Sequence, residues 1–353
     1  MTLLERKNTF IQLGHFLSQF ASEEINKKDA VLQNDVFFDD MLKQIKKSYE
    51  FNGWFTPKNM HFAFKNLSEA LTESSLEQWL SAYTINEPKP KTVAIIMAGN
   101  IPLVGFHDLL SVLISGHHAL VKQSSNDKQF LPFIVSYLQK VEPKFKGCVS
   151  FTENKLEDFD AVIATGSDNT ARYFDYYFGK YPHIIRKNRN SVAVLTGNES
   201  KEELEGVAED IFRYFGLGCR NVSKIFVPNK YDFDKLFKAV YKWHSVMNLA
   251  KYANNYDYNK AIYLMSEFSI LENGFLMIKE DTSYSSPIAT LFYEYYDDLK
   301  QLQNTLKRDS EKIQCIVASG FTKGEIVFGE TQKPKLWEYA DQVDTVDFLL
   351  KLT

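Results

Sequence analysis

The sequence predicts an α/β protein in which a parallel sheet of the nucleotide-binding type is followed by a second α/β domain. Between residues 91 and 196, short β-rich runs alternate with helical runs, which is typical of parallel strands joined by crossover helices. A length of 353 residues exceeds one ordinary core and indicates two domains. Before residue 86 the apolar spacing is helical only, which predicts an N-terminal helical layer over the sheet.

Composition and charge narrow the classes of function. Hydrophobic residues make up 44% and charged residues 24%, as in a soluble globular protein. The net charge of −4, with acids and bases interspersed, gives no electrostatic support for a nucleic-acid partner. The 3 cysteines are widely spaced and form no CxxC pair, so we expect no disulfide framework, no metal site and a cytoplasmic location. No apolar run approaches the roughly 18 residues of a membrane span, so neither export nor insertion is predicted.

The elements of the first domain follow from periodicity. Residues 1–85 carry Phe10, Leu13, Phe16 and Leu17 at helical spacing, and the polar, proline-containing stretch 86–91 leads into the sheet. We expect five strands, at residues 92–97, 119–122, 148–151, 161–164 and 191–195. Helices are expected near residues 103–115, 127–140 and 168–178. This assigns residues 1–196 to the N-terminal helices and a nucleotide-binding domain.

A catalytic domain is expected over residues 197–332, and a C-terminal return segment over residues 333–353. The catalytic domain should contain helices at 201–214, 232–250 and 295–308, and strands at 224–227, 275–279, 288–293 and 313–318. Residues 254–259 form a polar stretch after the second of these helices.

A glycine-flanked cysteine lies between the first helix and the first strand of the catalytic domain. Gly216 and Gly218 precede Cys219 and allow a close approach of a ligand or a positive φ, which a packing cysteine does not need. Arg220 and Lys224 are near in sequence and would favour the thiolate, the form that attacks a carbonyl carbon. The alternative is that Cys219 packs as a small buried apolar side chain, as isolated cysteines usually do.

Three further motifs follow strands of the first domain. They are Gly99-Asn100-Ile101-Pro102, Lys122-Gln123-Ser124-Ser125 and Thr165-Gly166-Ser167. The last opens a helix, whose free N–H groups and dipole favour phosphate. The G-x-G-x-x-G fingerprint is absent after the first strand, so a dinucleotide would bind in a variant way. Singly, each motif also fits ordinary turn or capping chemistry.

Together, in this order and spacing, the four motifs resemble the aldehyde dehydrogenase superfamily, from about residue 90 to residue 230 and more loosely to the end. The resemblance implies an aldehyde-dehydrogenase-like fold and, as the superfamily habit, a homo-oligomer. It also implies the site residues: Cys219 as nucleophile, Asn100 at the oxyanion site, Lys122 on the adenosine ribose, and Gly166 and Ser167 beside the pyrophosphate. The short length and the Arg220-Asn221 pair are most similar to the acyl-CoA reductase branch, which includes the reductase of bacterial luminescence.

Three departures from aldehyde oxidisers refine the expected chemistry. Residues 185–190 replace the segment whose glutamate activates water in those enzymes, so an acyl-cysteine should not be hydrolysed efficiently. In that place Arg186, Lys187 and Arg189 either meet phosphates or form a solvated basic turn. Residues 283–287 lack the glutamate that holds the nicotinamide ribose in the family. Ser125 replaces an acid common in NAD-selective members, and beside Ser124 and Lys122 it favours NADPH, with NADH as the alternative.

We therefore expect NADPH-dependent reduction of an acyl-CoA, or of another acyl thioester, to the aldehyde through a covalent acyl-Cys219. Coenzyme A is then part of the substrate. One alternative is an aldehyde-oxidising NAD(P) dehydrogenase with a base such as Glu280. The other is a catalytically silent subunit that binds nucleotide or acyl groups within a fatty-acid reductase complex. The 7 histidines show no partner in the sequence and are expected to be structural or superficial.

Overall fold

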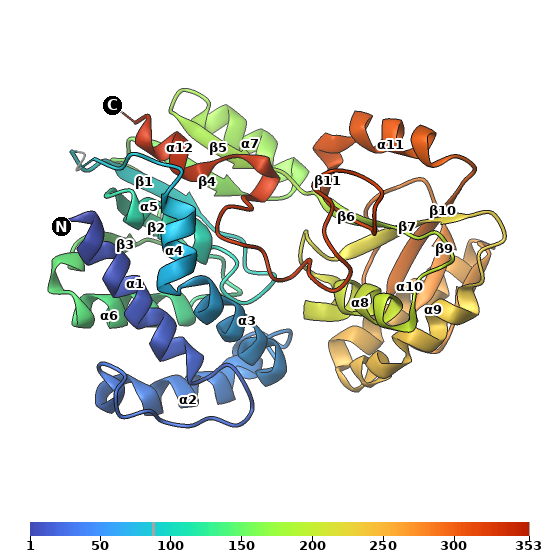
Figure 1. The fold of residues 1–353 in the computed structure, drawn as a ribbon, viewed down its shortest axis with the longest axis horizontal. Helices are drawn as coiled ribbons and strands as arrows, with labels where there is room; N and C mark the ends of the chain where they lie inside the picture. The colour runs from blue at the N-terminus through green and yellow to red at the C-terminus, as the bar shows by residue number, and fades with distance from the viewer. Residues whose placement is uncertain (87–88, 353) are drawn as a thin grey trace. The chain divides into compact units, whose positions relative to one another are not determined.

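The computed structural model describes residues 1–86 and 89–352. Glu87 and Pro88 of the expected lead-in stretch, and Thr353 of the expected return segment, lie outside the described residues. The chain divides into two compact units (Figure 1). The first combines Met1–Lys187 with Lys335–Thr353, and the second is Asn188–Pro334.

The first unit begins with the predicted helical layer. Its helices are α1 (Leu3–Ser18), α2 (Asn34–Phe51), α3 (Pro57–Ala70) and α4 (Glu73–Leu80). Thr2 starts α1 with a capping box, in which its side chain accepts from the Glu5 N–H and Glu5 accepts from the Thr2 N–H. The apolar stripe of α1, including Phe10 and Leu17, is fully buried. The helical periodicity of the sequence therefore marks the face that packs on the core.

The sheet of the first unit is wholly parallel, as predicted. Its strands are β1 (Thr92–Ile96), β2 (His118–Lys122), β3 (Val149–Phe151), β4 (Ala161–Thr165) and β5 (His183–Arg186), in the order β3-β2-β1-β4-β5. The connecting helices are α5 (Phe106–Ile114), α6 (Phe130–Val141) and α7 (Asp168–Phe178). The strand order reverses between β1 and β4, and ligands of open α/β sheets bind at the carboxyl ends of strands beside such a reversal.

The C-terminal segment belongs to the core of the first unit. It contains the short helix α12 (Thr345–Leu350), and its residues Leu336, Val346 and Leu349 join the core formed by the helical layer and β1. Trp79 donates its indole N–H to the Tyr339 hydroxyl at 2.6 Å. His117 donates from Nε2 to the Leu349 carbonyl at 3.0 Å, and burial lowers the pKa of its imidazole. His117 thus has a structural role.

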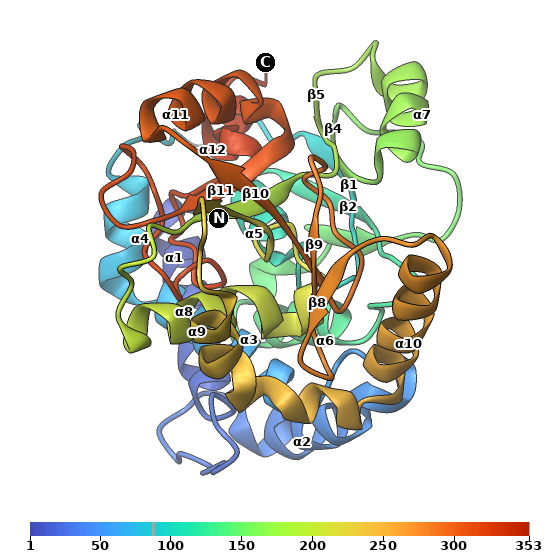
Figure 2. The same cartoon turned by 90° about the vertical axis from the view of Figure 1, so that its right-hand side faces the viewer.

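The second unit is built on a six-stranded sheet. Its strands are β6 (Asn190–Val194), β7 (Val222–Pro228), β8 (Ile270–Glu272), β9 (Met277–Glu280), β10 (Thr290–Tyr296) and β11 (Ile313–Val317), in the order β11-β6-β7-β10-β9-β8. Only β8 is antiparallel to its neighbour among the pairings of the described strands. Its helices are α8 (Lys201–Phe212), α9 (Phe233–Val240), α10 (Ala250–Met265) and α11 (Leu299–Arg308), which can be followed in Figure 2.

Two predictions about elements were wrong. The strand predicted at 191–195 was assigned to the first sheet, but as β6 it pairs with β7 and β11 in the second, and β5 closes the first sheet instead. Strand pairing depends on distant partners, which periodicity does not encode. The polar stretch 254–259 lies inside α10, because the helix buries tyrosines, Tyr252, Tyr256 and Tyr263, in place of aliphatic residues.

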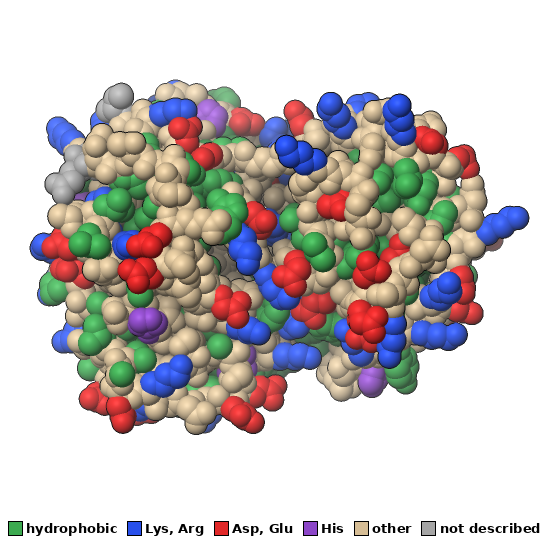
Figure 3. All heavy atoms as spheres, in the orientation of Figure 1, with side chains coloured by type: hydrophobic (Ala, Val, Ile, Leu, Met, Phe, Trp, Pro, Cys, Tyr) green, Lys and Arg blue, Asp and Glu red, His purple; other side chains and the backbone are tan. Residues whose placement is uncertain are grey.

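The described residues show neither a membrane helix nor a metal cluster. In residues 1–86 and 89–352 no helix is both long and apolar enough to cross a bilayer. The same residues contain no group of three or more His, Cys, Asp or Glu side chains that could hold a metal ion. Figure 3 shows acidic and basic side chains interspersed over the visible face, in keeping with the small net charge.

Candidate active site

The carboxyl edge of the first sheet gathers the candidate cofactor residues. Ile96 of β1 pairs with Lys122 of β2 on one side and with Ala164 of β4 on the other. The loops that leave these three strands therefore start side by side. These strand ends and loops carry six of the residues predicted for the first unit: Asn100, Lys122, Ser124, Ser125, Gly166 and Ser167. Cys219 belongs to the second unit.

The loop after β1, which carries the exposed Asn100, packs tightly on the loop after β2. A Cβ atom at Gly99 would lie 2.6 Å from both Cβ and Oγ of Ser124, so only glycine fits at this position. Leu103 has left-handed backbone (φ 56°) and donates its N–H to Oδ2 of Asp127 at 3.1 Å. Burial raises the pKa of Asp127 to about 6. The two loops are thus fixed to each other on both sides of Asn100.

Lys122 and the two serines that follow it differ in their surroundings. The Lys122 ammonium donates to the Asn154 carbonyl at 3.0 Å. The Ser124 hydroxyl accepts from the Asn126 N–H at 3.3 Å, and Ser125 is exposed. Ser124 therefore combines a turn contact with its packing against Gly99, whereas Lys122 and Ser125 present polar groups near the strand end.

Gly166 and Ser167 join β4 to α7. The Ser167 side chain caps α7 by accepting from the Thr170 N–H at 3.3 Å, and Gly166 donates its N–H to the Arg186 carbonyl at 3.2 Å. The first turn of α7 thus lies at the carboxyl edge, where the partial positive charge of a helix N-terminus favours an anion. With the ammonium of Lys122 at the same edge, these residues fit a nucleotide bearing phosphates.

The Cys219 loop of the second unit begins where α8 ends. Tyr214, Phe215 and Gly216 all have left-handed backbone, with φ of 53°, 59° and 76°. They turn the chain sharply out of the helix, and Cys219 follows in an exposed position before β7. Ser191 of β6 donates its hydroxyl to the Cys219 carbonyl at 3.0 Å. Cys219 is therefore not the buried hydrophobe that isolated cysteines usually are.

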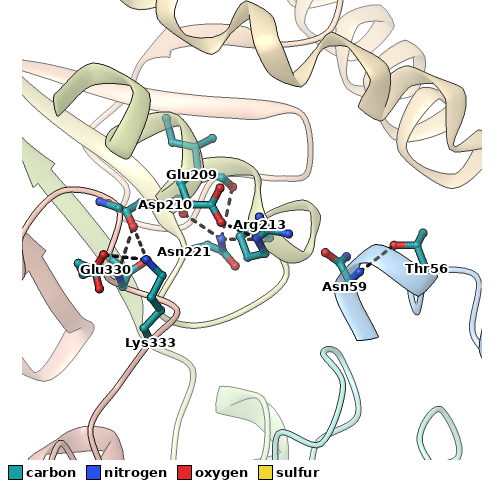
Figure 4. A network of polar contacts seen from close by, with 11 residues as sticks. Thr56, Asn59, Glu209, Asp210, Arg213, Asn221, Glu330 and Lys333 are labelled. Atoms are coloured by element: carbon teal, nitrogen blue, oxygen red, sulfur yellow. Dashed lines mark hydrogen bonds and ion pairs between the residues drawn. The ribbon is translucent and has the colours of Figure 1, made fainter. Parts of the chain in front are cut away.

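The residues on either side of Cys219 are held by a polar network (Figure 4). The Asn221 side chain accepts the Gly218 N–H and donates to the carbonyl groups of Asp210 and Arg213 at the end of α8. Figure 4 shows Asn221 beside Asp210 and Arg213. Arg220 donates from Nε to the Thr331 carbonyl at 2.7 Å. Thr331 belongs to residues 328–334, which we call the strap and which also contain Glu330 and Lys333.

The strap is attached to α8 by Asp210. The Asp210 carboxylate accepts the Gly329 N–H at 2.7 Å and the Thr331 hydroxyl at 2.8 Å. Burial raises the pKa of Asp210 to about 6. Through Arg220 and Thr331, the cysteine loop is thus linked to the same carboxylate that holds the strap.

A comparison with protein families places the chain among known proteins. The model of the family described as "Acyl-CoA reductase (LuxC)" matches residues 14–253, more than half of the chain. The chain belongs to this family. Its curated relatives include the "Long-chain acyl-protein thioester reductase" of Aliivibrio fischeri, 24% identical over 230 residues, which cover 58% of this chain and 47% of the relative. The "Long-chain acyl-protein thioester reductase 2" of Photobacterium leiognathi is 24% identical over 213 residues, covering 54% and 44%. The match thus spans about half the length of these curated relatives.

Solved structures establish the fold of this acyl-CoA reductase family member. Aldehyde dehydrogenase 21 from Physcomitrella patens has a TM-score of 0.64 at 12% identity, covering 90% of this chain and 73% of that one. An NAD+ complex of aldehyde dehydrogenase from Bacillus cereus has a TM-score of 0.57 at 15% identity, covering 90% and 71%. The fold is therefore aldehyde-dehydrogenase-like, as predicted.

Two basic residues of this acyl-CoA reductase family member differ from the sequence expectations. Arg186 is buried, forms an ion pair with Asp108 and donates to the Thr345 hydroxyl at 3.0 Å, so it is neither a solvated turn residue nor a phosphate ligand. The Lys224 ammonium lies 2.7 Å from the Glu294 carboxylate and over the rings of Phe226 and Tyr284. Its charge is already balanced, which weakens the expectation that it favours a thiolate at Cys219.

Sequence reasoning assigned no structural role to three residues that organise the candidate site: Asp127, Asp210 and Asn221, the last of which entered only as part of the Arg220-Asn221 pair. Each is a short polar side chain close to a motif or on a helix stripe, where it resembles a cap or a solvated residue. The signal for Asn221 was its position two residues after Cys219. Residues 283–287 contain no glutamate, as the sequence shows. Ser283 in this segment is exposed and donates its backbone N–H to the Asp281 carboxylate.

Proposed function

We propose that this chain reduces an acyl thioester to the aldehyde, with Cys219 as the nucleophile and NADPH as the hydride donor. The observation that carries the proposal is an exposed cysteine whose neighbours on both sides are held by partly buried hydrogen bonds, in a chain of the acyl-CoA reductase family. The names of the curated relatives support a long-chain acyl group carried on a protein, and the description of the family supports one carried on coenzyme A.

The chemistry at Cys219 is a thiol exchange followed by reduction. The thiolate attacks the acyl carbonyl carbon, its Sγ–C bond forms, and the bond from that carbon to the departing thiol breaks. The departing thiolate takes up a proton. The backbone N–H of Cys219 and the carboxamide of Asn100 stabilise the intermediate oxyanion, an effect worth about 3 kcal/mol per donor. When bound, the nicotinamide cofactor supplies the hydride that converts the acyl-cysteine to aldehyde and regenerates the thiolate.

The cofactor would be held at the carboxyl edge of the first sheet. Gly166 and Ser167 offer the N-terminal turn of α7 to the phosphates, and Lys122 offers an ammonium group to the ribose. The exposed Ser125 replaces an acid at a position where an acid would repel a 2′-phosphate. Ser124 supports this edge through its packing on Gly99. These features favour NADPH over NADH.

The segment that replaces the water-activating glutamate also supports reduction over aldehyde oxidation. Arg186 lies in this segment, and its ion pair with Asp108 is buried. The Asp108 carboxylate is thereby engaged with a guanidinium and is not free to take a proton from water. Glu280, the other candidate base, is exposed at the end of β9. An acyl-cysteine would then persist until hydride or a thiol reaches it.

The test uses the full chain with a panel of acyl-CoAs and with acylated carrier protein, each with NADPH or NADH. We expect aldehyde formation and NADPH oxidation in the wild type, none above background in Cys219→Ala, and wild-type rates in Cys148→Ala, which changes a half-buried cysteine in the other unit. Intact mass should gain one acyl group in the wild type without cofactor and none in Cys219→Ala. Equal aldehyde production by wild type and Cys219→Ala would refute the proposal. Free acid formed from aldehyde and NAD(P)+ without a thiol acceptor would favour the oxidising alternative.

A further inference from the structure

We propose that Asn221 is the positioning residue for Cys219. Its carboxamide joins the end of α8 to the turn that contains the cysteine, and this contact sets the directions of the Cys219 thiol and of its backbone N–H. The inference deepens the proposed function, since it takes Cys219 as the nucleophile. All the contacts that carry it lie within the second unit.

The donor side of the carboxamide completes the end of α8. The last carbonyl groups of a helix have no partners within the helix, and here the chain leaves through three left-handed residues. Nδ2 of Asn221 donates to the Asp210 carbonyl at 2.9 Å and to the Arg213 carbonyl at 2.8 Å. Both hydrogens of the amide are thus used on the helix end. The side chain is only 2% exposed, so water does not compete for these bonds.

The acceptor side closes the turn around Cys219. Oδ1 of Asn221 accepts the Gly218 N–H at 2.8 Å, and the Asn221 N–H donates to the Gly218 carbonyl at 3.0 Å. Cys219 and Arg220 are the two residues between these anchors. With the Ser191 hydroxyl on the Cys219 carbonyl, the peptide groups on both sides of the cysteine are fixed. The backbone N–H proposed for the oxyanion therefore takes its direction from this turn.

Only a carboxamide of this length supplies both sides of the contact. An ionised carboxylate keeps the acceptor for Gly218 but has no hydrogen to donate and faces two carbonyl oxygens, and alanine removes donors and acceptor together. Misplacement of a reacting group by about 1 Å can cost about 100-fold in rate. Loss of Asn221 should therefore slow the chemical step while leaving substrate binding largely unchanged.

The test compares Asn221→Ala and Asn221→Asp with Asn259→Ala in the full chain. Asn259 is a matched control in the same unit, because it is buried and its Nδ2 donates to the Ile288 carbonyl at 2.9 Å. Folding is verified by circular dichroism. Hydrogen exchange should rise in peptides covering residues 213–221 in both Asn221 variants and stay at wild-type levels there in Asn259→Ala.

Two rate measurements then separate positioning from stability. For both Asn221 variants we expect kcat to fall about 10- to 100-fold with KM within about threefold of the wild type. The rate of Cys219 alkylation by iodoacetamide at neutral pH should change about fivefold or more, since the thiol and the peptide groups beside it are no longer held in one arrangement, while alkylation of Cys148 is unchanged. Asn259→Ala should leave all three quantities at wild-type values.

Each outcome bears on the proposal. Wild-type kcat and Cys219 alkylation in a folded Asn221→Ala would show that the residue serves stability alone. If Asn221→Ala does not fold, the nearly isosteric Asn221→Asp decides by the same rates. If the wild type itself forms no aldehyde, the proposed function fails, and the ratio of Cys219 to Cys148 alkylation in the variants still decides whether Asn221 positions the cysteine.

Discussion

At the scale of single residues, Asp127 shows how burial sets the properties of the site. Its carboxyl group holds the loop that carries Asn100, and burial raises its pKa to about 6. In the unfolded chain the pKa is near 3.9. The folded state therefore binds the proton more tightly, so the contribution of Asp127 to stability is greatest below pH 4 and is lost as the pH rises through 6.

Replacing Asp127 by Asn should therefore stabilise the first unit at high pH. The amide oxygen still accepts the Leu103 N–H, and no charge is buried. The pKa difference corresponds to about 3 kcal/mol in the free energy of unfolding, an upper value for the gain at pH 8. We expect the urea midpoint of Asp127→Asn to exceed that of the wild type at pH 8 and the difference to shrink towards pH 4.5. A difference that is constant with pH would show that Asp127 keeps an ordinary pKa in the folded protein.

Some candidate residues lie in short sequence motifs, whereas the properties of others depend on partners far away in the sequence. Cys219 and Asn100 lie in motifs that can be recognised within a few positions. Arg186 and Lys224 were misjudged because their partners, Asp108 and Glu294, are 78 and 70 residues away in the sequence. A basic residue looks solvated until its partner is known, so the chemistry of such side chains follows from tertiary structure alone.

At the scale of elements, the packing of the two loops after β1 and β2 gives a second prediction. A Cβ at residue 99 would lie 2.6 Å from the Ser124 side chain, closer than atoms pack without displacement. Gly99→Ala should therefore lower the free energy of unfolding by about 1–3 kcal/mol. The double variant Gly99→Ala, Ser124→Gly should recover most of this loss, since it removes the atoms in conflict.

A double-mutant cycle over these two positions measures the coupling directly. The free energies of unfolding of the wild type, both single variants and the double variant give an interaction term, which we expect to be about 1 kcal/mol or more in favour of the double variant. Additive effects of the two substitutions would show that the loops do not press on each other at this point.

Elements were predicted well where periodicity alone decides and poorly where it does not. The helices α1, α5 and α8 follow from apolar spacing, and their main stretches agree with the prediction. The sheet to which β6 belongs was not encoded locally, because a short strand with an apolar centre pairs equally well with any exposed strand edge. The helix α10 was not predicted, because its buried face is built from tyrosines.

At the scale of the whole molecule, the first unit is made from two segments that are far apart in the sequence. Leu349 of the return segment is fully buried in the core that also contains Phe10 of α1 and Leu110 of α5. The second unit, in contrast, is one continuous stretch, Asn188–Pro334. The sequence predicts a continuous second domain and a separate return segment, but it does not indicate that this segment completes the first core, because closing a core with a distant segment depends on tertiary contacts alone.

This construction predicts that damage to the return segment spreads through the first unit only. Leu349→Ala opens a cavity in a core shared by both segments and should lower the free energy of unfolding of that unit by about 2–5 kcal/mol. Lys351→Ala, two residues on, removes an exposed side chain paired with Asp347 and should change it by less than about 0.5 kcal/mol. In Leu349→Ala, native-state hydrogen exchange should rise in α1 and α5 as well as in α12, while peptides from 188–334 keep their wild-type protection, because local destabilisation is shared within a cooperative unit. An increase confined to residues 345–352 would mean that the return segment covers the first unit without completing its core.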